Sequence, residues 1–354
     1  MAIGLDDVVA AETALSDVDG LAGRLIIRGR SLDELAGRET ADGMLGLLLG
    51  DAFDPAPTGT ELGAARAEIF ARFKDKLADL AQLPVYDGVR AAVAQLPDDD
   101  TAETALLLIA APAVLVPALI RTQAGTPAVA PDAGVAHAAD ILHVLLGRAP
   151  TMPEVNGLDT YLVTVADHGL NASTFAARVV ASTQAGLTSS VLAAYGALKG
   201  PLHGGAPGPV LDMIDAVGAP ERAEPVLQAI LDRGERLMGF GHRIYRVRDP
   251  RADALKGALG RLQRTERLHL ALAVEAAALK LLRAKKPDRP LETNVEFFTA
   301  LLLDALGFPR EVFTAVFAMG RTIGWVAHAR EQALSGRLIR PKSRYVGPMP
   351  REAA

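Results

Sequence analysis

The chain has 354 residues, of which 50 % are hydrophobic and 22 % are charged, with a formal net charge of −5 at pH 7. This composition excludes a wholly disordered chain. The negative balance argues against a broad nucleic-acid-binding surface, which needs clustered excess Lys and Arg. There is no Cys, which excludes disulfide scaffolds, Cys-ligated zinc, iron–sulfur clusters and thiol nucleophiles.

The beginning of the chain predicts a short β-hairpin. Residues 8–15 and 24–27 are strand candidates, and Asp19-Gly20 between them is a typical hairpin turn. The first residues lack the basic start and the apolar centre of a signal peptide. We therefore expect a cytoplasmic protein.

The longest apolar run covers residues 105–120 and contains Pro112 and Pro117. It is shorter than the roughly 20 residues that a membrane-spanning helix needs. Because proline interrupts helices, we expect a buried pair of helices here, in a soluble protein.

The rest of the chain predicts helices. Aromatic residues make up only 5 % of the sequence, whereas strands are enriched in them. Apolar residues recur at three- and four-residue spacing in residues 191–198, 268–281 and 313–323. Helix start and stop signals agree with this pattern: Ser31 with Glu34, Gly200-Pro201, and Gly307-Phe308-Pro309. We therefore predict an almost all-α protein with one N-terminal hairpin.

The seven histidines show no i, i+4 pair and no HExxH motif, so no metal site is predicted. Three of them stand out by context. His203 lies among Gly and Pro directly after a predicted helix, where a neutral imidazole can donate to a carbonyl that becomes an enolate. A histidine packed at a turn is the alternative. Asp167-His168 is a candidate acid/base pair, although the good helix caps around it allow a structural role.

His242 follows Gly239-Phe240-Gly241 and is surrounded by arginines. Four of them lie within nine residues: Arg243, Arg246, Arg248 and Arg251. Because Arg pairs bidentately with carboxylates and phosphates, the segment predicts an anion pocket with a proton donor. A solvated charged surface is the alternative.

Together these segments resemble the citrate synthase family, which includes the 2-methylcitrate synthases. The resemblance covers almost the whole chain and depends on several motifs in order: GLDDVVAAET at residues 4–13, GRLIIRG at 23–29, DHGLNASTF at 167–175, GALKGPLHGG at 196–205, MGFGHRIYRVRDPR at 238–251, NVE at 294–296, RTIGW at 321–325 and RLIRPKS at 337–343. One such motif is weak support, whereas this ordered set is specific.

The resemblance implies a helical subunit of two domains. Residues 1–204 and 302–354 correspond to a large dimerisation domain, and residues 205–301 to a small inserted domain that closes over the substrates. It also implies an obligate homodimer in which each subunit contributes to its partner's active site.

The reaction implied is the condensation of acetyl-CoA with oxaloacetate, followed by thioester hydrolysis, which is the work of an acyltransferase without a permanently bound cofactor. The resemblance makes Glu296 the base, His203 the donor to the enolate oxygen and His242 the donor to the oxaloacetate ketone. Oxaloacetate would be bound by His168, Arg251, Arg321 and, across the dimer, Arg340. Acyl-CoA would be contacted by Gly239, Phe240, Gly241, Arg243 and Arg246.

The sequence departs from the family pattern at two positions. Glu296 stands where the family usually has Asp, and one extra methylene moves the carboxylate by about 1 Å, which can cost about 10²-fold in rate. Gly169 stands where the family usually has Glu, which removes a charge beside His168.

Three alternatives remain open at this stage. Citrate and 2-methylcitrate differ by one methyl group, worth about 1–3 kcal/mol in an apolar pocket, and Phe297 and Phe298 are candidates for shaping that pocket. A weakly active or non-catalytic dicarboxylate-binding paralogue is the second alternative, because of Glu296. A subunit that modulates a catalytic homologue is the third.

Overall fold

The computed structural model describes residues 8–204, 207–242, 244–262, 265–288 and 291–349. Three strands form one small antiparallel sheet: β1 (Ser16–Asp19), β2 (Arg24–Ile27) and β3 (Arg30–Ser31). Helices make up most of the remainder, which confirms the predicted all-α class. They are α1 (Leu32–Leu35), α2 (Ala41–Leu49), α3 (Gly59–Phe73), α4 (Leu77–Leu80), α5 (Val85–Val93), α6 (Ala102–Gln123), α7 (His137–Leu146), α8 (Met152–Val165), α9 (Ala172–Ala181), α10 (Leu187–Leu198), α11 (Gly208–Val217), α12 (Ala223–Asp232), α13 (Pro250–Arg261), α14 (Thr265–Lys285), α15 (Val295–Ala305) and α16 (Phe313–Ser335), with 3₁₀ turns η1 (Lys74–Lys76), η2 (Pro220–Arg222) and η3 (Arg310–Val312).

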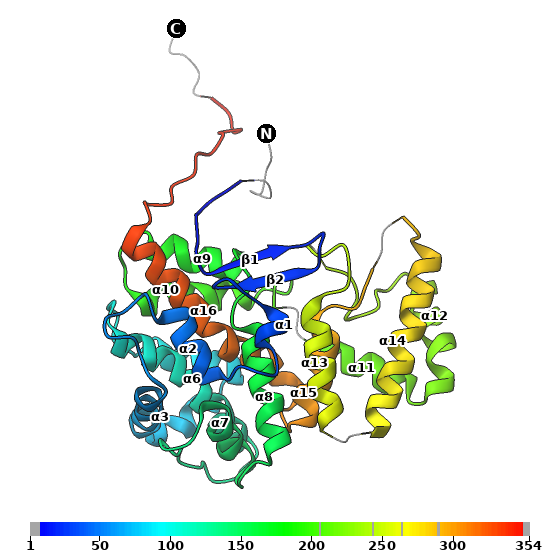
Figure 1. Cartoon of the computed structure of the whole chain (residues 1–354), viewed down its shortest axis with the longest axis horizontal. Helices are drawn as coiled ribbons and strands as arrows, with labels where there is room; N and C mark the ends of the chain where they lie inside the picture. Colours follow the sequence, from blue (N-terminus) through cyan, green and yellow to red (C-terminus); the bar gives the residue numbers. More distant parts are fainter. Residues whose placement is uncertain (1–7, 205–206, 243, 263–264, 289–290, 350–354) are drawn as a thin grey trace.

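The long helix α16 is central to the packing. It contacts α6, α8, α9 and α10, and its residues from Phe313 to Ala329 are almost all buried. Helices α11, α12 and α14 lie together at the other side of the molecule, with α13 and α15 between the two groups (Figure 1). Because α13 packs against α8 on one side and contacts α14 on the other, it joins the two groups of helices. The division into a large domain of residues 1–204 and 302–354 and a small domain of residues 205–301 stays a prediction.

The hairpin is shifted from its predicted position. Its first strand is Ser16–Asp19 and not residues 8–15, while the second, Arg24–Ile27, is as predicted. Ser16 pairs with Ile27 and Asp19 with Arg24. The Leu15 carbonyl accepts the Arg28 N–H at 2.8 Å, and the short second strand ends before it could pair with residues 8–14. Val8 and Val9 are accordingly exposed.

The apolar run forms one helix, α6, rather than the predicted pair. Pro112 and Pro117 both lie inside it, and residues 104–119 are all buried. Burial against α3, α5, α7 and α16 offsets the hydrogen bonds that the prolines cannot make. Among the described residues, α6 is the one helix long and apolar enough to span a membrane, and 89 % of its most apolar window is buried in the molecule. It is therefore a core helix.

The other helix predictions are confirmed. The three periodic windows lie in α10, α14 and α16. Helices α10 and α15 end at the predicted stop signals, with C-caps at Lys199 and Leu306. Ser31 and Glu34 form the expected capping box.

Candidate active site

Loops and helix ends from distant parts of the chain bring the candidate residues together. The rings of His168 and His242 lie 5.7 Å apart between centroids. Arg251 Nη2 lies 3.2 Å from His242 Nε2. The charge of Arg321 acts on both His168 and His203. The three histidines and two arginines therefore form one cluster, supplied by the loops before α9, after α10 and before α13, and by α13 and α16.

His203 is held as a neutral imidazole. Its Nε2 accepts the backbone N–H of Ser173 at 3.2 Å and lies 2.8 Å from Ser173 Oγ. Ser173 is in the first turn of α9, so the ring also lies at the positive end of that helix. Burial, and then the charge of Arg321, lower the pKa of His203 to about 4. A neutral ring whose Nε2 accepts carries its proton on Nδ1, which is the atom that can donate to a substrate oxygen.

His242 has the opposite tautomer. Its Nδ1 accepts the backbone N–H groups of Ile244 and Tyr245, each at 3.1 Å. Burial, followed by the charge of Arg251, lowers the pKa of His242 to about 4. The proton of the neutral ring is therefore on Nε2, directed toward the guanidinium of Arg251. Two donors that lie 3.2 Å apart form a site for an acceptor, such as a ketone or carboxylate oxygen.

Asp249 holds Arg251 in place. Its two carboxylate oxygens accept from Arg251 Nε at 3.0 Å and Nη2 at 2.8 Å, and both side chains are buried. Asp249 Oδ2 also accepts the backbone N–H of Val295 at 3.1 Å, so this one carboxylate ties Arg251 to the start of α15.

Arg321 is buried with an unused donor. Its Nε donates to the Val165 carbonyl, and its Nη2 has no hydrogen-bond partner among the described residues. Burial lowers the pKa of Arg321 to about 10, with Arg251 adding to the effect and Asp167 opposing it. A buried guanidinium with a free N–H fits a carboxylate ligand.

Glu296 lies in the first turn of α15. Asn294 caps this helix by accepting the Glu296 N–H at 3.0 Å, and its Nδ2 donates to the Gly241 carbonyl at 2.8 Å. Glu296 is thereby tied to the loop that carries His242. Burial raises the pKa of Glu296, while Arg251 and Arg236 oppose that rise. A raised pKa makes the carboxylate a stronger base.

Phe297 and Phe298, which follow Glu296 in the chain, pack in the protein core. Both are fully buried, with their ring centroids 5.1 Å apart. Phe297 also packs on Phe240, at 5.3 Å. That these rings shape the acyl-group pocket stays a prediction.

The residues expected to contact acyl-CoA are only partly accessible. Phe240 is 5 % exposed. Gly239 and Gly241 have positive φ, and a Cβ at Gly239 would lie 2.9 Å from the Phe297 side chain, which explains the glycine there. Arg246 is exposed, and Arg243 lies outside the described residues.

Arg340 lies far along the chain end that follows α16. Residues 336–349 form no helix or strand, and Arg340 is exposed. This segment leaves the body of the molecule (Figure 1). The structure therefore does not bring Arg340 to the histidine cluster of its own chain.

Gly169 has a structural explanation. Its φ is +60°, a conformation that favours glycine, and an added Cβ would lie 3.3 Å from Val18. Its N–H donates to Ser16 Oγ at 2.9 Å. Gly169, which departs from the family pattern, therefore allows the His168 loop to pack closely on β1.

Three site residues were missed by the sequence analysis: Ser173, Tyr245 and Asp249. Tyr245 is 3 % exposed, and its hydroxyl lies 3.1 Å from His168 Nε2. The Asp249-Pro250 pair was a signal for an N-cap followed by proline at the first helical position. Nothing in the sequence signalled the other two contacts, because they join segments that are far apart in the chain.

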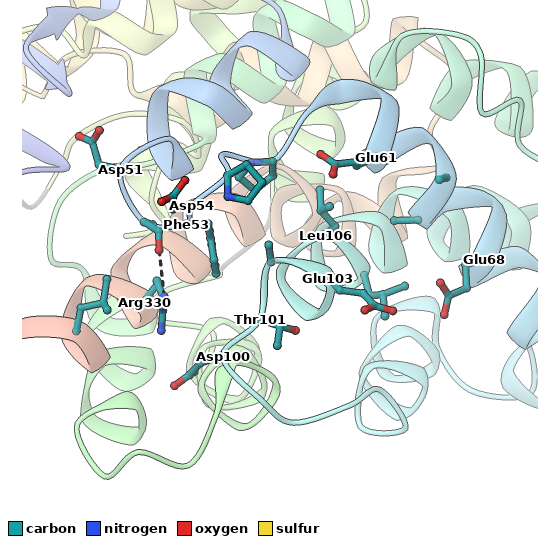
Figure 2. A pocket seen from close by; sticks show the side chains of 18 residues that line it. Asp51, Phe53, Asp54, Glu61, Glu68, Asp100, Thr101, Glu103, Leu106 and Arg330 are labelled. Atoms are coloured by element: carbon teal, nitrogen blue, oxygen red, sulfur yellow. Dashed lines mark hydrogen bonds between the residues drawn. The ribbon is translucent and has the colours of Figure 1, made fainter.

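A separate cavity lies on α3, α6 and α16. It measures about 780 Å³ and is lined by apolar residues and six carboxylates, with Arg330 donating to the Ala52 carbonyl at 3.2 Å (Figure 2). None of the described candidate residues lines it. In the part of the chain that the structure describes, no group of three or more His, Asp or Glu could hold a metal ion.

Comparison with known proteins places the chain in a family. The family model "Citrate synthase, C-terminal domain" matches residues 4–342. The chain is 40 % identical to "Putative citrate synthase 2" of Mycobacterium tuberculosis, covering 98 % of this chain and 93 % of the relative. It is 38 % identical to the 2-methylcitrate synthase of the same organism, over 97 % and 90 %.

A solved structure agrees in fold. Citrate synthase of Thermoplasma acidophilum, in a ternary complex with carboxymethyl coenzyme A and oxaloacetate, superposes with a TM-score of 0.85 at 29 % identity, covering 99 % of this chain and 97 % of that one. The chain is thus an enzyme of the acyl-CoA-condensing class, and it belongs to the citrate synthase family. Its relatives support citrate or methylcitrate synthase activity.

Proposed function

We propose that the protein condenses acetyl-CoA with oxaloacetate and water to give citrate and CoA. The observation that carries this proposal is His203, a neutral histidine whose Nε2 is occupied by the Ser173 N–H and whose Nδ1 carries the proton. A neutral donor suits an enolate oxygen, because it stabilises developing charge without protonating the substrate beforehand.

In the first step, Glu296 removes a proton from the acetyl methyl group. The C–H electron pair forms the C=C bond of the enolate, and the thioester oxygen takes the charge while accepting from His203 Nδ1. The raised pKa of Glu296 makes it a better base for this weak carbon acid.

In the second step, the enolate carbon attacks the oxaloacetate ketone. The ketone oxygen becomes an alkoxide that accepts hydrogen bonds from His242 Nε2–H and from Arg251, which lie side by side, and it takes its proton from water. Arg251, Arg321 and His168 hold the oxaloacetate, with the unused Nη2 of Arg321 available for a carboxylate. Water then hydrolyses the citryl thioester and releases CoA.

The acyl-CoA would run along Gly239, Phe240 and Gly241, with Arg243 or Arg246 near its phosphates. The exposure of Arg246 supports this placement. The burial of Phe240 limits its part to shaping the loop.

The working unit in this proposal is a homodimer in which Arg340 completes the partner's site. Helices α9 and α10 pack on one another, and their outer faces carry half-buried apolar residues: Phe175, Val179, Val180, Leu192 and Ala193. Such an apolar face is typical of a dimer interface. In this proposal, the exposed segment around Arg340 extends away from its own subunit and enters the partner's active site.

A second candidate is 2-methylcitrate synthesis from propionyl-CoA. It is favoured by a 2-methylcitrate synthase relative nearly as similar as the citrate synthase relative, at 38 % against 40 % identity. A competition assay decides: equal acetyl-CoA and propionyl-CoA are supplied with limiting oxaloacetate, and the products are separated by mass. A majority of citrate supports the proposal, and a majority of 2-methylcitrate replaces it.

A further inference from the structure

The segment formed by β1 and the residue after it, Gly20, contacts both loops that carry the histidines proposed to bind oxaloacetate. His168 lies in the loop between α8 and α9, and His242 in the loop before α13. The two histidines are 74 residues apart in the sequence, and the segment that contacts both of their loops comes from the N-terminal hairpin.

At one end of β1, Ser16 binds the His168 loop twice. Its hydroxyl donates to Asp167 Oδ2 and accepts the Gly169 N–H at 2.9 Å. Asp167 is fully buried and is also bound by His328 Nε2 at 3.2 Å. The residues on both sides of His168 are therefore fixed to Ser16.

Just past the other end, Gly20 binds the His242 loop. Its carbonyl accepts the Arg246 N–H at 2.8 Å. The approach is so close that a Cβ on Gly20 would lie 2.4 Å from the Ile244 carbonyl oxygen. Ile244 and Tyr245 supply the two N–H groups that fix the His242 tautomer, so the contact is with the backbone that orients the catalytic ring.

We propose that β1 is a strap that sets the spacing of the two loops, and that Ser16 and Gly20 are positioning residues for oxaloacetate binding. The strand is paired with β2 along its length, and four residues of extended chain are stiff over their span of about 13 Å. A displacement of the loop at one end is therefore transmitted through β1 to the loop at the other end. The inference rests on the proposed function for its ligand.

Three variants test the strap. Gly20→Ala places a methyl group against the Ile244 carbonyl, and Ser16→Ala removes both bonds to the His168 loop. Gly46→Ala is the matched control, because no atom lies within 4 Å of its added Cβ. Binding of oxaloacetate is measured by calorimetry, KM and kcat are measured for the active proteins, and amide hydrogen exchange is followed in residues 244–248.

We expect each strap variant to weaken oxaloacetate binding at least fivefold, with kcat at saturating oxaloacetate reduced less than twofold. The double variant should lose less than the product of the single losses, because breaking either end already releases the strap. Ser16→Ala should also speed exchange in residues 244–248, which it does not touch. Gly46→Ala should match the unmodified protein.

Two results would overturn the proposal. One is a loss of oxaloacetate affinity in the double variant equal to the product of the single losses. The other is unchanged amide hydrogen exchange of residues 244–248 in Ser16→Ala. If the unmodified protein does not bind oxaloacetate, the proposed function fails instead. The exchange measurement needs no ligand and still decides whether β1 couples the two loops.

Discussion

Both carboxylate oxygens of Asp249 accept hydrogen bonds from the Arg251 guanidinium. One of these oxygens also accepts the N–H of Val295, the residue before Glu296. The group proposed to bind oxaloacetate and the base proposed to act on the acyl-CoA are thus fixed to a single buried carboxylate. This arrangement holds the two substrates' sites at a set distance.

Removing that carboxylate should harm both binding and catalysis. In Asp249→Asn, Arg251 loses its counter-charge, and breaking a buried ion pair costs about 3–5 kcal/mol of stability. We expect a lower unfolding temperature, a higher KM for oxaloacetate and a lower kcat. Asp304→Asn is the control, because Asp304 lies near the other end of α15 and its side chain is 40 % exposed. Wild-type kinetics in Asp249→Asn would contradict the assigned role.

His203→Ala should separate catalysis from oxaloacetate binding. Loss of a positioned oxyanion donor costs about 10²–10³ in kcat, so we expect a fall of more than a hundredfold. Calorimetry should find oxaloacetate binding retained. The exposed His269 provides the control substitution, His269→Ala, with unchanged activity. A fall of less than tenfold would remove His203 from the mechanism.

Arg251→Ala should also lower turnover by more than a hundredfold, but through oxaloacetate. The substitution removes the donor beside His242 Nε2, so the loss should appear as weaker oxaloacetate binding. Titration of oxaloacetate by calorimetry measures it directly. Unchanged affinity would mean that the dicarboxylate binds elsewhere.

Glu296→Asp tests the length of the base. The shorter side chain would withdraw the carboxylate from the acyl-CoA by about 1 Å, and a shift of that size can cost about 10²-fold in rate. We therefore expect lower kcat with little change in oxaloacetate affinity. A rise in kcat would mean that Glu296 is misplaced in the natural protein.

Stability should fall on mild acidification. The pKa values of His137, His203 and His242 are lowered by burial to about 3, 4 and 4, from 6.5. The unfolded chain therefore binds more protons than the folded one below pH 6.5, which destabilises the fold as the pH falls toward 4. Asp159, whose pKa burial raises to about 6, opposes this over part of the range. Urea unfolding between pH 7 and 4 measures the slope, which Asp159→Asn should steepen. A flat profile would contradict neutral buried histidines.

Mixed dimers test the placement of Arg340. Arg340→Ala and His203→Ala subunits are unfolded together and refolded. If Arg340 acts on the partner's site, each mixed dimer has one complete site, and random pairing restores about a quarter of full activity. Action within one chain leaves the mixture inactive.

The sequence predicted the residues that carry charge or protons far better than the residues that hold them. His168, His203, His242, Arg251 and Arg321 were identifiable because each lies in a distinctive local motif, and the structure gathers them into one cluster. The roles of Ser173 and Tyr245 were not, because each depends on a contact with a residue at least 30 positions away.

In the fold, too, local features were predictable from the sequence and long-range contacts were not. Helix ends followed from local signals such as Gly200-Pro201, whereas the register of β1 depends on which residues β2 leaves available for pairing. The continuity of α6 through Pro112 and Pro117 depends on the helices packed around it. Local rules about proline could not anticipate that burial.

The most direct test of the account is CoA release by the purified protein, with oxaloacetate and either acetyl-CoA or propionyl-CoA, compared with Glu296→Gln. We expect release by the unmodified protein, faster with acetyl-CoA, and a loss of more than a hundredfold in the variant. No release with either acyl-CoA, although oxaloacetate binds, would contradict the account and leave a dicarboxylate-binding protein with the fold of an enzyme.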